Sequence, residues 1–475
     1  MTVEIDRRPI WFLLFLRFRR PLFFAAIALV FLYVVATPAS DGLSEAGKDA
    51  MAIFLLCLIL WVSNAIPPAV TGLFAIVLVP LLGVLPKKDA YALFGNEAVF
   101  FILGAFILAA AIMRTGLSNR IALTIMKKTG STPKRLLLSV FFLAAVLSFF
   151  MSEHAVAAML FPTVLAIANG LGLRPGASNY GKLLFLSLAW GCVIGGVATF
   201  LGGARVPLAV GMLKESTGET IGFLSYTIAV FPLVMIMMGF AVFLLPRLFP
   251  IDIEGVDKAR EILSKRIKTM GKVSTNEYAV GVVLVLTVAA WMMLGHTAGL
   301  ANIALISVVV LFVLKVVSWK DIEEYVNWGV VLMYGGAITL GVALDRSGAA
   351  AWLAYAAIGE WAGSPWMVIA FFSFLTLVLT ECMSNAAVIA VLLPIGIGLA
   401  ERFAMSPMLI TYAIAIPAGL AFALPMATPA NAIAASSNYI TVSDLMKGGV
   451  IMTVVSWIVI MLVAAFWWPL IGIGG

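Results

Sequence analysis

Long apolar segments recur through the whole chain and restrict it to one environment. Hydrophobic residues make up 63% of the sequence and charged residues 11%, and the mean hydropathy is +1.11. A soluble domain is about one half apolar and about one quarter charged, so this chain cannot cover its apolar surface with groups that face water. The sequence therefore predicts an all-α polytopic membrane protein. The apolar segments lie at residues 22–38, 51–65, 67–85, 97–113, 136–170, 180–212, 227–246, 278–295, 299–317, 328–345, 366–402, 408–439 and 448–470.

The distribution of charge and the lack of catalytic motifs argue against other classes of protein. The net charge is +7, but the basic residues flank apolar segments at 7–20, 127–135 and 258–268, as they do in cytoplasmic loops rather than in nucleic-acid-binding surfaces. The three cysteines lie in apolar stretches and form neither a disulfide framework nor a metal-ligand pattern. The sequence contains no HExxH motif and no nucleophile elbow beside a plausible base, so we do not expect an enzyme.

The longest polar segment divides the chain and fixes the expected topology. We expect residues 249–277 to form a cytoplasmic linker with an amphipathic helix on the membrane surface. We expect a multi-pass protein of the cell inner membrane. The basic flanks predict that its N-terminus lies in the cytoplasm. About eleven crossings follow if 136–170 and 366–402 are re-entrant hairpins, and the C-terminus is then outside. The predicted units are the N-terminal cytoplasmic segment and first helix (1–50), a first repeat (51–248), the linker (249–277) and a second repeat (278–475).

The two halves carry the same sequence pattern. "MSEHAVAAMLFP" at 151–162 aligns without a gap with "MSNAAVIAVLLP" at 383–394, and "GAFILAAAIMRTG" at 104–116 aligns with "GAITLGVALDRSG" at 336–348. An odd number of predicted crossings separates the copies, so the repeat is inverted. Inverted repeats with helices broken near the membrane midplane are typical of secondary transporters.

Polar or flexible residues interrupt four apolar segments. Two interruptions are the predicted hairpin tips, at 152–154 and 384–386, and two are the glycine- and proline-rich stretches 195–207 and 423–438. Irregular backbone survives inside a bilayer only where it lines a cavity. A helix N-terminus favours an anion, and carbonyls of unwound backbone favour a cation. The pattern therefore predicts an anion site flanked by cation sites.

The motifs "SFFMSEHAVAAMLFP", "TECMSNAAVIAVLLP" and "ALPMATPANAIA" resemble those of the divalent anion/sodium symporters, which carry dicarboxylates, citrate or sulfate. The resemblance runs from about residue 50 to the end. It implies a homodimer in a lipid bilayer, an elevator mechanism, a small-molecule anion as substrate, and no cofactor apart from Na⁺ as a coupling ion. The substrate-binding residues it implies are Ser152, Glu153, His154, Arg205, Ser384, Asn385, Thr428 and Pro429. The ion-binding residues are Ser384, Asn385, Ala427 and Asn431, with a sodium ion in the second half, and Thr199 and Gly203 in the first.

The first half departs from the family pattern. Glu153 and His154 stand where the family has Asn-Thr, and Arg205 follows a Gly-Gly-Ala loop. In the second half only Ala386, in place of Thr, departs from the tip motif. Four interpretations stay open. Arg205 can replace a sodium ion with Glu153 as its counter-ion, or Glu153 or His154 can carry a coupling proton. The Glu153–Arg205 pair can also be purely structural, or Arg205 can bind the anion directly.

Four other polar residues have smaller expected roles. Glu381 precedes the second tip and is expected to support the site. Arg114 and Arg346 end the matched segments and are expected to anchor the membrane interface. His296 lies at the end of a span and is expected to pack or to face the interface.

These observations predict a secondary active transporter of small organic anions, either dicarboxylates or tricarboxylates. It would be coupled to sodium or protons, or work as an anion exchanger. The alternative is a cation/proton antiporter of the same architecture, with Glu153 as the exchanging carboxylate.

Overall fold

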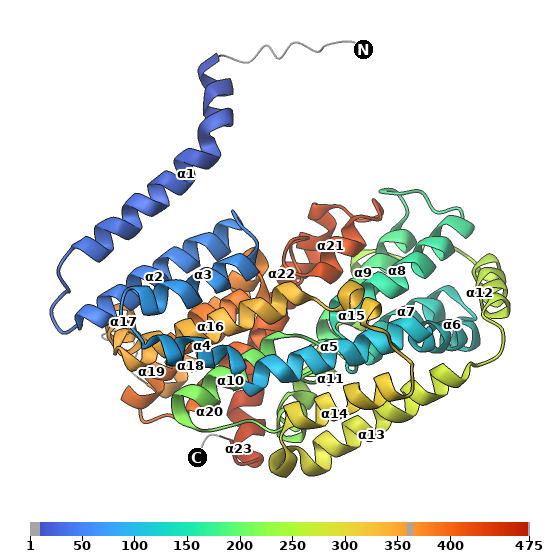
Figure 1. Cartoon of the computed structure of the whole chain (residues 1–475). Coiled ribbons are helices and arrows are strands. Elements are labelled where there is room, and N and C mark those ends of the chain that lie inside the picture. Colours follow the sequence, from blue (N-terminus) through green and yellow to red (C-terminus); the bar gives the residue numbers. More distant parts are fainter. Residues whose placement is uncertain (1–9, 359–363, 474–475) are drawn as a thin grey trace.

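The computed structural model describes residues 10–358 and 364–473, so the ends of the predicted N- and C-terminal units, at 1–9 and 474–475, lie outside the described residues. The regular secondary structure of the described ranges is all helical, with no strand, which confirms the predicted all-α fold (Figure 1). Within these described ranges, eight helices are long and apolar enough to cross a membrane. Length alone thus identifies fewer spans than the eleven expected, because several apolar helices are shorter or broken.

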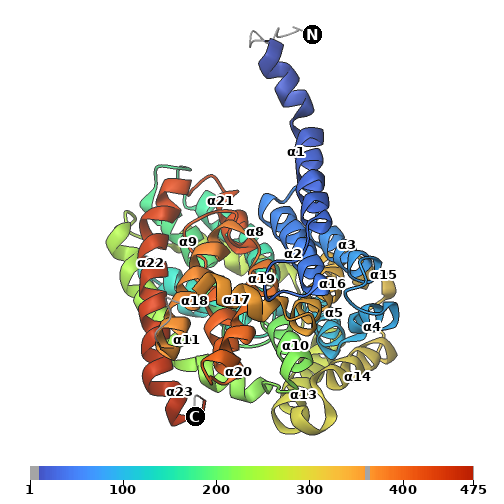
Figure 2. The same ribbon diagram turned by 90° about the vertical axis from the view of Figure 1, so that its left-hand side faces the viewer.

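The described part of the first half contains twelve α-helices and one short 3₁₀ helix. They are α1 (Ile10–Ala36), α2 (Glu45–Ser63), α3 (Pro68–Leu81), α4 (Lys87–Ala92), η1 (Leu93–Gly95), α5 (Glu97–Thr115), α6 (Leu117–Thr129), α7 (Pro133–Leu147), α8 (Glu153–Gly170), α9 (Asn179–Gly195), α10 (Arg205–Thr217), α11 (Phe223–Leu248) and α12 (Asp257–Thr269). Helix α1 stands away from the body, and α23 lies on the opposite side in both views (Figures 1 and 2).

The described part of the second half repeats much of this order. Its elements are α13 (Thr275–Ala298), α14 (Leu300–Val313), α15 (Trp319–Tyr325), α16 (Trp328–Arg346), α17 (Ala349–Ile358), α18 (Pro365–Cys382), α19 (Asn385–Arg402), α20 (Pro407–Ala415), η2 (Pro417–Gly419), α21 (Pro429–Ala435), α22 (Val442–Leu462), η3 (Val463–Trp467) and α23 (Trp468–Leu470). Five pairs of helices each begin 232 residues apart, namely α3 and α14, α4 and α15, α6 and α17, α7 and α18, and α8 and α19.

The two halves interlock. Helix α3 packs on α16, and its counterpart α14 packs on α5. In the same way α10 packs on α19, and α21 packs on α8. Each hairpin therefore packs against the broken helix of the other half, so the two hairpin tips and the two breaks lie near one another.

Two equivalent ion pairs also connect the two halves. Arg114 Nε donates to Asp321 Oδ1 at 2.8 Å, and Arg346 Nη1 lies 3.7 Å from Asp89 Oδ2. The Ser318 hydroxyl and backbone amide, together with Arg114, hold the pKa of Asp321 below its usual range, because each donates to or attracts the carboxylate. The two arginines, expected to anchor the membrane interface, each form an ion pair with the opposite half.

The linker helix α12 packs on protein. Its apolar side buries Ala259 and Leu263 against α6 and α8, rather than facing the membrane surface as expected. Arg266 Nη1 donates to Thr163 Oγ1 at 2.8 Å and Nη2 donates to the Pro162 carbonyl at 3.2 Å. Through these two bonds the Arg266 guanidinium fastens α12 to the middle of α8.

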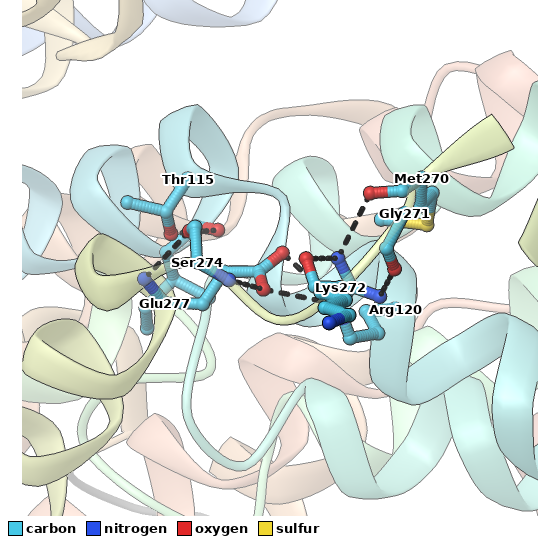
Figure 3. Close-up of polar contacts among 8 residues, drawn as sticks. Thr115, Arg120, Met270, Gly271, Lys272, Ser274 and Glu277 are labelled. Atoms are coloured by element: carbon cyan, nitrogen blue, oxygen red, sulfur yellow. Dashed lines mark hydrogen bonds and ion pairs between the residues drawn. The ribbon is translucent and has the colours of Figure 1, made fainter.

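Arg120 of α6 fastens the end of the linker (Figure 3). Its Nε donates to both carboxylate oxygens of Glu277 at 3.0 and 3.1 Å. Its Nη atoms donate to the carbonyls of Met270, Gly271 and Lys272. Glu277 is buried and also accepts the Ser274 amide at 2.9 Å in a capping box at the start of α13. One guanidinium therefore joins α6 to the start of the second half.

Replacing Arg120 should weaken this junction. In Arg120→Met the buried Glu277 carboxylate loses its counter-ion, which is expected to destabilise the fold by about 3 kcal/mol. The measurement is the apparent melting temperature of the detergent-purified protein. Lys265→Ala removes an exposed ion pair with Glu261 on α12 and should change it little. Equal melting temperatures for wild type and Arg120→Met would contradict the assignment.

Candidate transport site

One cavity of about 780 Å³ joins the two hairpin tips and the two broken helices. Its remaining wall comes from α2, α3, α5, α15 and α16. All eight residues predicted to contact substrate line it, as do Ala427 and Gly203 of the predicted ion ligands. Thr199 and Asn431 are buried behind its surface.

The two tips have the same local structure. Ser152 Oγ accepts the Ala155 amide at 3.4 Å, and Ser384 Oγ accepts the Ala387 amide at 3.3 Å. Serine favours the N-cap position because its hydroxyl takes one of the amides that a helix leaves unpaired at its start. The first turns of α8 and α19 thus both present the positive end of a helix dipole to the cavity.

The first tip carries an ion pair that reaches the broken helix. The Glu153 amide donates to the Gly202 carbonyl at 3.0 Å, and Glu153 Oε2 lies 3.8 Å from Arg205 Nη1. Arg205 Nη2 donates to the Gly196 carbonyl at 2.6 Å. The Glu153 residue is 5% exposed and Arg205 is 1% exposed. Buried charges of this kind are tolerated only when they are paired.

Two glycines make room for the Arg205 guanidinium. A Cβ at Gly203, or at Gly419 in η2 of the second half, would overlap guanidinium atoms. The guanidinium therefore lies between the unwound segments of both halves. Gly419 was not among the predicted site residues. The sequence signal that could have identified it is the proline and glycine of "PAGL" at 417–420, which indicate a break in the helix.

Glu381 organises the second broken helix. Its carboxylate accepts the backbone amides of Phe422, Ala423 and Leu424 at 2.8 to 3.1 Å. The Thr380 hydroxyl lies 2.7 Å from the Ala418 carbonyl and 2.9 Å from Asn385 Oδ1. Glu381 thus supplies acceptors to amides that the break in the helix leaves unpaired.

Asn431 leaves one buried oxygen unused. Its amide nitrogen donates to the Ala421 and Leu424 carbonyls at 3.2 Å, and its backbone amide donates to Thr428 Oγ1. Its Oδ1 is buried without a hydrogen-bond partner. A buried polar atom without a partner is rare in native proteins, and an oxygen in this state suits a bound cation. The Asn431 oxygen is therefore a candidate cation ligand.

The corresponding first-half hydroxyl is already engaged. Thr199 Oγ1 donates to the Phe149 carbonyl at 2.6 Å and accepts the Leu201 amide at 3.1 Å. Gly203, the other predicted ion ligand of this half, packs against the guanidinium of Arg205. The first half therefore offers a fixed cation where the second offers a free oxygen.

Sequence reasoning missed the wall of the cavity that α2, α15 and α16 form. Asn64 ends α2 in the left-handed conformation, with φ 49°, and Asn327 is the N-cap of α16. Both line the cavity, as does Glu324. The asparagine and proline cluster "SNAIPP" at 63–68 was a signal of irregular backbone between two spans.

The sequence model of the sodium:sulfate symporter transmembrane region matches residues 21–473. The chain belongs to this family. The resemblance inferred from the hairpin motifs is thereby confirmed, and the protein is a membrane transporter rather than an enzyme.

Curated relatives extend over nearly the whole length of this family member. Sodium-dependent dicarboxylate transporter SdcS of Staphylococcus saprophyticus is 30% identical over 468 residues, which cover 93% of this chain and 90% of the relative. SdcS of Staphylococcus aureus is 28% identical over 469 residues, with the same coverage.

Two solved structures share the fold. The YdaH transporter of Alcanivorax borkumensis aligns with a TM-score of 0.56 at 16% identity, covering 85% of this chain and 99% of that one. MtrF of Neisseria gonorrhoeae, described as one of a class of antimetabolite efflux pumps, aligns with a TM-score of 0.53 at 13% identity, covering 94% and 97%.

The native cysteines provide a test of the cavity. Cys382 is exposed and lines it, whereas Cys57 and Cys192 are buried. A polar maleimide is expected to label native protein in detergent at Cys382 alone, because only this thiol meets solvent. Peptide mass spectrometry locates the adduct, and Cys382→Ser should remain unlabelled. Fast labelling of Cys382→Ser would show that the buried thiols are accessible and that the packing described here is wrong.

Proposed function

We propose that this family member is a sodium-coupled carrier of small dicarboxylates. The observation that carries the proposal is the convergence of two serine-capped helix N-termini on one cavity, with the unpaired Asn431 oxygen buried behind its wall. The printed function of the SdcS relatives, sodium-dependent dicarboxylate transport, supports the same substrate class.

The substrate lies between the two tips. A linear dicarboxylate presents one carboxylate to the first turn of α8, with Ser152 and His154, and the other to α19, with Ser384 and Asn385. Free amides and the helix dipole at each end favour these charges. Thr428 and Pro429, at the start of α21, complete the wall on the second-half side.

Arg205 takes the place of the first sodium ion. Its guanidinium bonds the Gly196 carbonyl at the end of α9, which is the type of oxygen that would otherwise face a cation. Glu153 acts as its fixed counter-ion. Direct contact of Arg205 with the anion is disfavoured, because only 1% of the residue is exposed. Sodium therefore binds in the second half alone, near Ser384, Asn385, Ala427 and Asn431.

The hairpins and broken helices move together as an elevator against a scaffold that forms a homodimer. Polar contacts at the N-terminal end of α5 would have to break in such a movement. Glu97 Oε2 lies 2.6 Å from Lys214 Nζ, and Asn96 Nδ2 donates to Glu215 Oε1 at 2.7 Å. These contacts join scaffold helix α5 to α10, and they separate when α10 moves. The N-terminus lies in the cytoplasm and the C-terminus outside.

The second candidate is a cation/proton antiporter that uses Glu153. The observation in its favour is that Glu153 Oε2 is buried at the cavity without a hydrogen-bond donor. The nearby guanidinium weighs against it, because a permanent positive charge competes with an exchanging cation.

Ligand-induced stabilisation tests the proposal. Succinate is expected to raise the melting temperature in sodium chloride and not in choline chloride. A ligand at a hundredfold excess over Kd stabilises by about 2.7 kcal/mol. Asn431→Ala should lose the sodium requirement together with most of the binding, whereas the exposed Asn276→Ala on α13 should behave as wild type. Stabilisation by cations or pH, but by no anion, would favour the antiporter.

A double-mutant cycle tests the role of Arg205. Glu153→Gln and Arg205→Met each leave one buried charge without its partner, so each is expected to destabilise the fold by about 3–5 kcal/mol. The double variant restores neutrality and should recover part of this loss. It should also bind succinate within about tenfold of wild type, a difference of about 1.4 kcal/mol. A stable double variant that does not bind would instead indicate direct contact between Arg205 and the anion.

A further inference from the structure

The charges around the cavity do not balance those of a dicarboxylate. Among the described residues that line it, Glu153, His154, Arg205 and Glu324 are the Asp, Glu, Lys, Arg and His side chains. Glu153 and Arg205 neutralise each other at 3.8 Å. Arg205 therefore occupies the position of a sodium ion without adding net positive charge to the site.

The remaining charges leave the loaded site negative. A dicarboxylate brings two negative charges, and a sodium ion in the second half brings one positive charge. Glu324 adds a further negative charge from the scaffold wall. An uncompensated charge that moves through a hydrocarbon region is costly. The substrate and the sodium ion together carry one net negative charge. They become electrically neutral only if one more positive charge moves with them.

His154 is the group placed to supply that charge. It lies in the first turn of α8, is exposed, and lines the cavity between the two tips. Within the part of the chain that the structure describes, its ring has no hydrogen-bond or ion-pair partner. An imidazole titrates near neutral pH, and its protonated form donates from both nitrogens.

We propose that His154 takes up one proton when a dicarboxylate binds, and that the proton travels with the substrate and sodium. The inference rests on the proposed function and deepens it. One proton moves from water to the free ring nitrogen, and the imidazolium donates to the substrate carboxylate at the first tip. When the carboxylate leaves on the other side of the membrane, the proton returns to water.

No neighbouring group duplicates this role. The elements packed against α8 are α5, α6, α7, α9, α12 and α21. Their charged side chains near α8 are paired elsewhere or lie far from the tip. Arg114 pairs with Asp321, Arg120 with Glu277, and Lys182 with Asp444. Arg266 donates a hydrogen bond to Thr163. The connection between α6 and α7, at the end of α7 opposite the tip, carries Lys127, Lys128, Lys134 and Arg135. Tyr325 and Cys382 also line the cavity, but neither a phenol nor a thiol can supply a positive charge.

Proton uptake on binding tests the inference. Succinate is added to the purified full-length protein in saturating sodium and dilute buffer, and an indicator dye follows the pH between about 7.5 and 8.5, where both succinate carboxyls are ionised. Wild type is expected to take up about one proton for each succinate bound. Its Kd should rise about tenfold for each unit of pH above the pKa of the free imidazole, because the neutral ring must then be protonated.

The chain contains only two histidines, which provides a matched control. His154→Gln should bind succinate more weakly, without proton uptake and with a Kd independent of pH. His296→Gln, beside a separate cavity of about 130 Å³, should behave as wild type. The melting temperatures of both variants without ligand show whether they are folded.

Each other outcome has a defined meaning. Proton uptake that persists in His154→Gln and disappears in Glu153→Gln would overturn the inference and assign the proton to Glu153. Succinate binding by wild type without proton uptake would overturn the inference and leave the proposed function intact. No binding of any dicarboxylate by wild type in sodium would overturn the proposed function, and the inference with it.

Discussion

The structure depends on how polar groups are satisfied where helices break inside an apolar environment. Each break exposes amides and carbonyls that hydrocarbon cannot solvate. In the second half the Glu381 carboxylate accepts three of these amides. In the first half the Glu153 amide and the Arg205 guanidinium pair with carbonyls of the unwound segment. Both breaks are therefore held by charged residues, and the polar surface that remains faces the cavity.

The two halves solve the same problem with opposite charges. Glu381 is an anion that accepts amides, and Arg205 is a cation that donates to a carbonyl. The second half keeps an unpaired oxygen, on Asn431, whereas the first half has none of this kind on Thr199. A fixed guanidinium cannot leave the site as an ion does. In the proposed function, the guanidinium is a permanent part of the binding surface, and ion exchange is left to the second half.

The repeat made much of the fold predictable, because its signal combines hydropathy with residues of fixed local role. Serine at 152 and 384 marked both helix starts, and the offset of 232 residues recurs in five pairs of helices. The pairing of Arg114 with Asp321 could not be predicted, because it joins halves whose relative placement the local pattern does not contain. The same holds for Gly419 beside Arg205, where space rather than chemistry decides the residue. Likewise, the amphipathic pattern of α12 does not distinguish a membrane surface from the protein surface formed by α6 and α8.

The symmetry of the repeat relates two helix ends that have different surroundings. The N-terminal ends of α5 and α16 correspond, and each begins at an asparagine cap. At α16 this end lines the large cavity, whereas at α5 it is joined to α10 by Asn96 and Glu97. Exchanging the roles of the halves would close the cavity at the N-terminal end of α16 and open one at the N-terminal end of α5. The helices would stay interlocked. Two nearly equivalent arrangements of one chain, differing in which end is joined, are the physical requirement for alternating access.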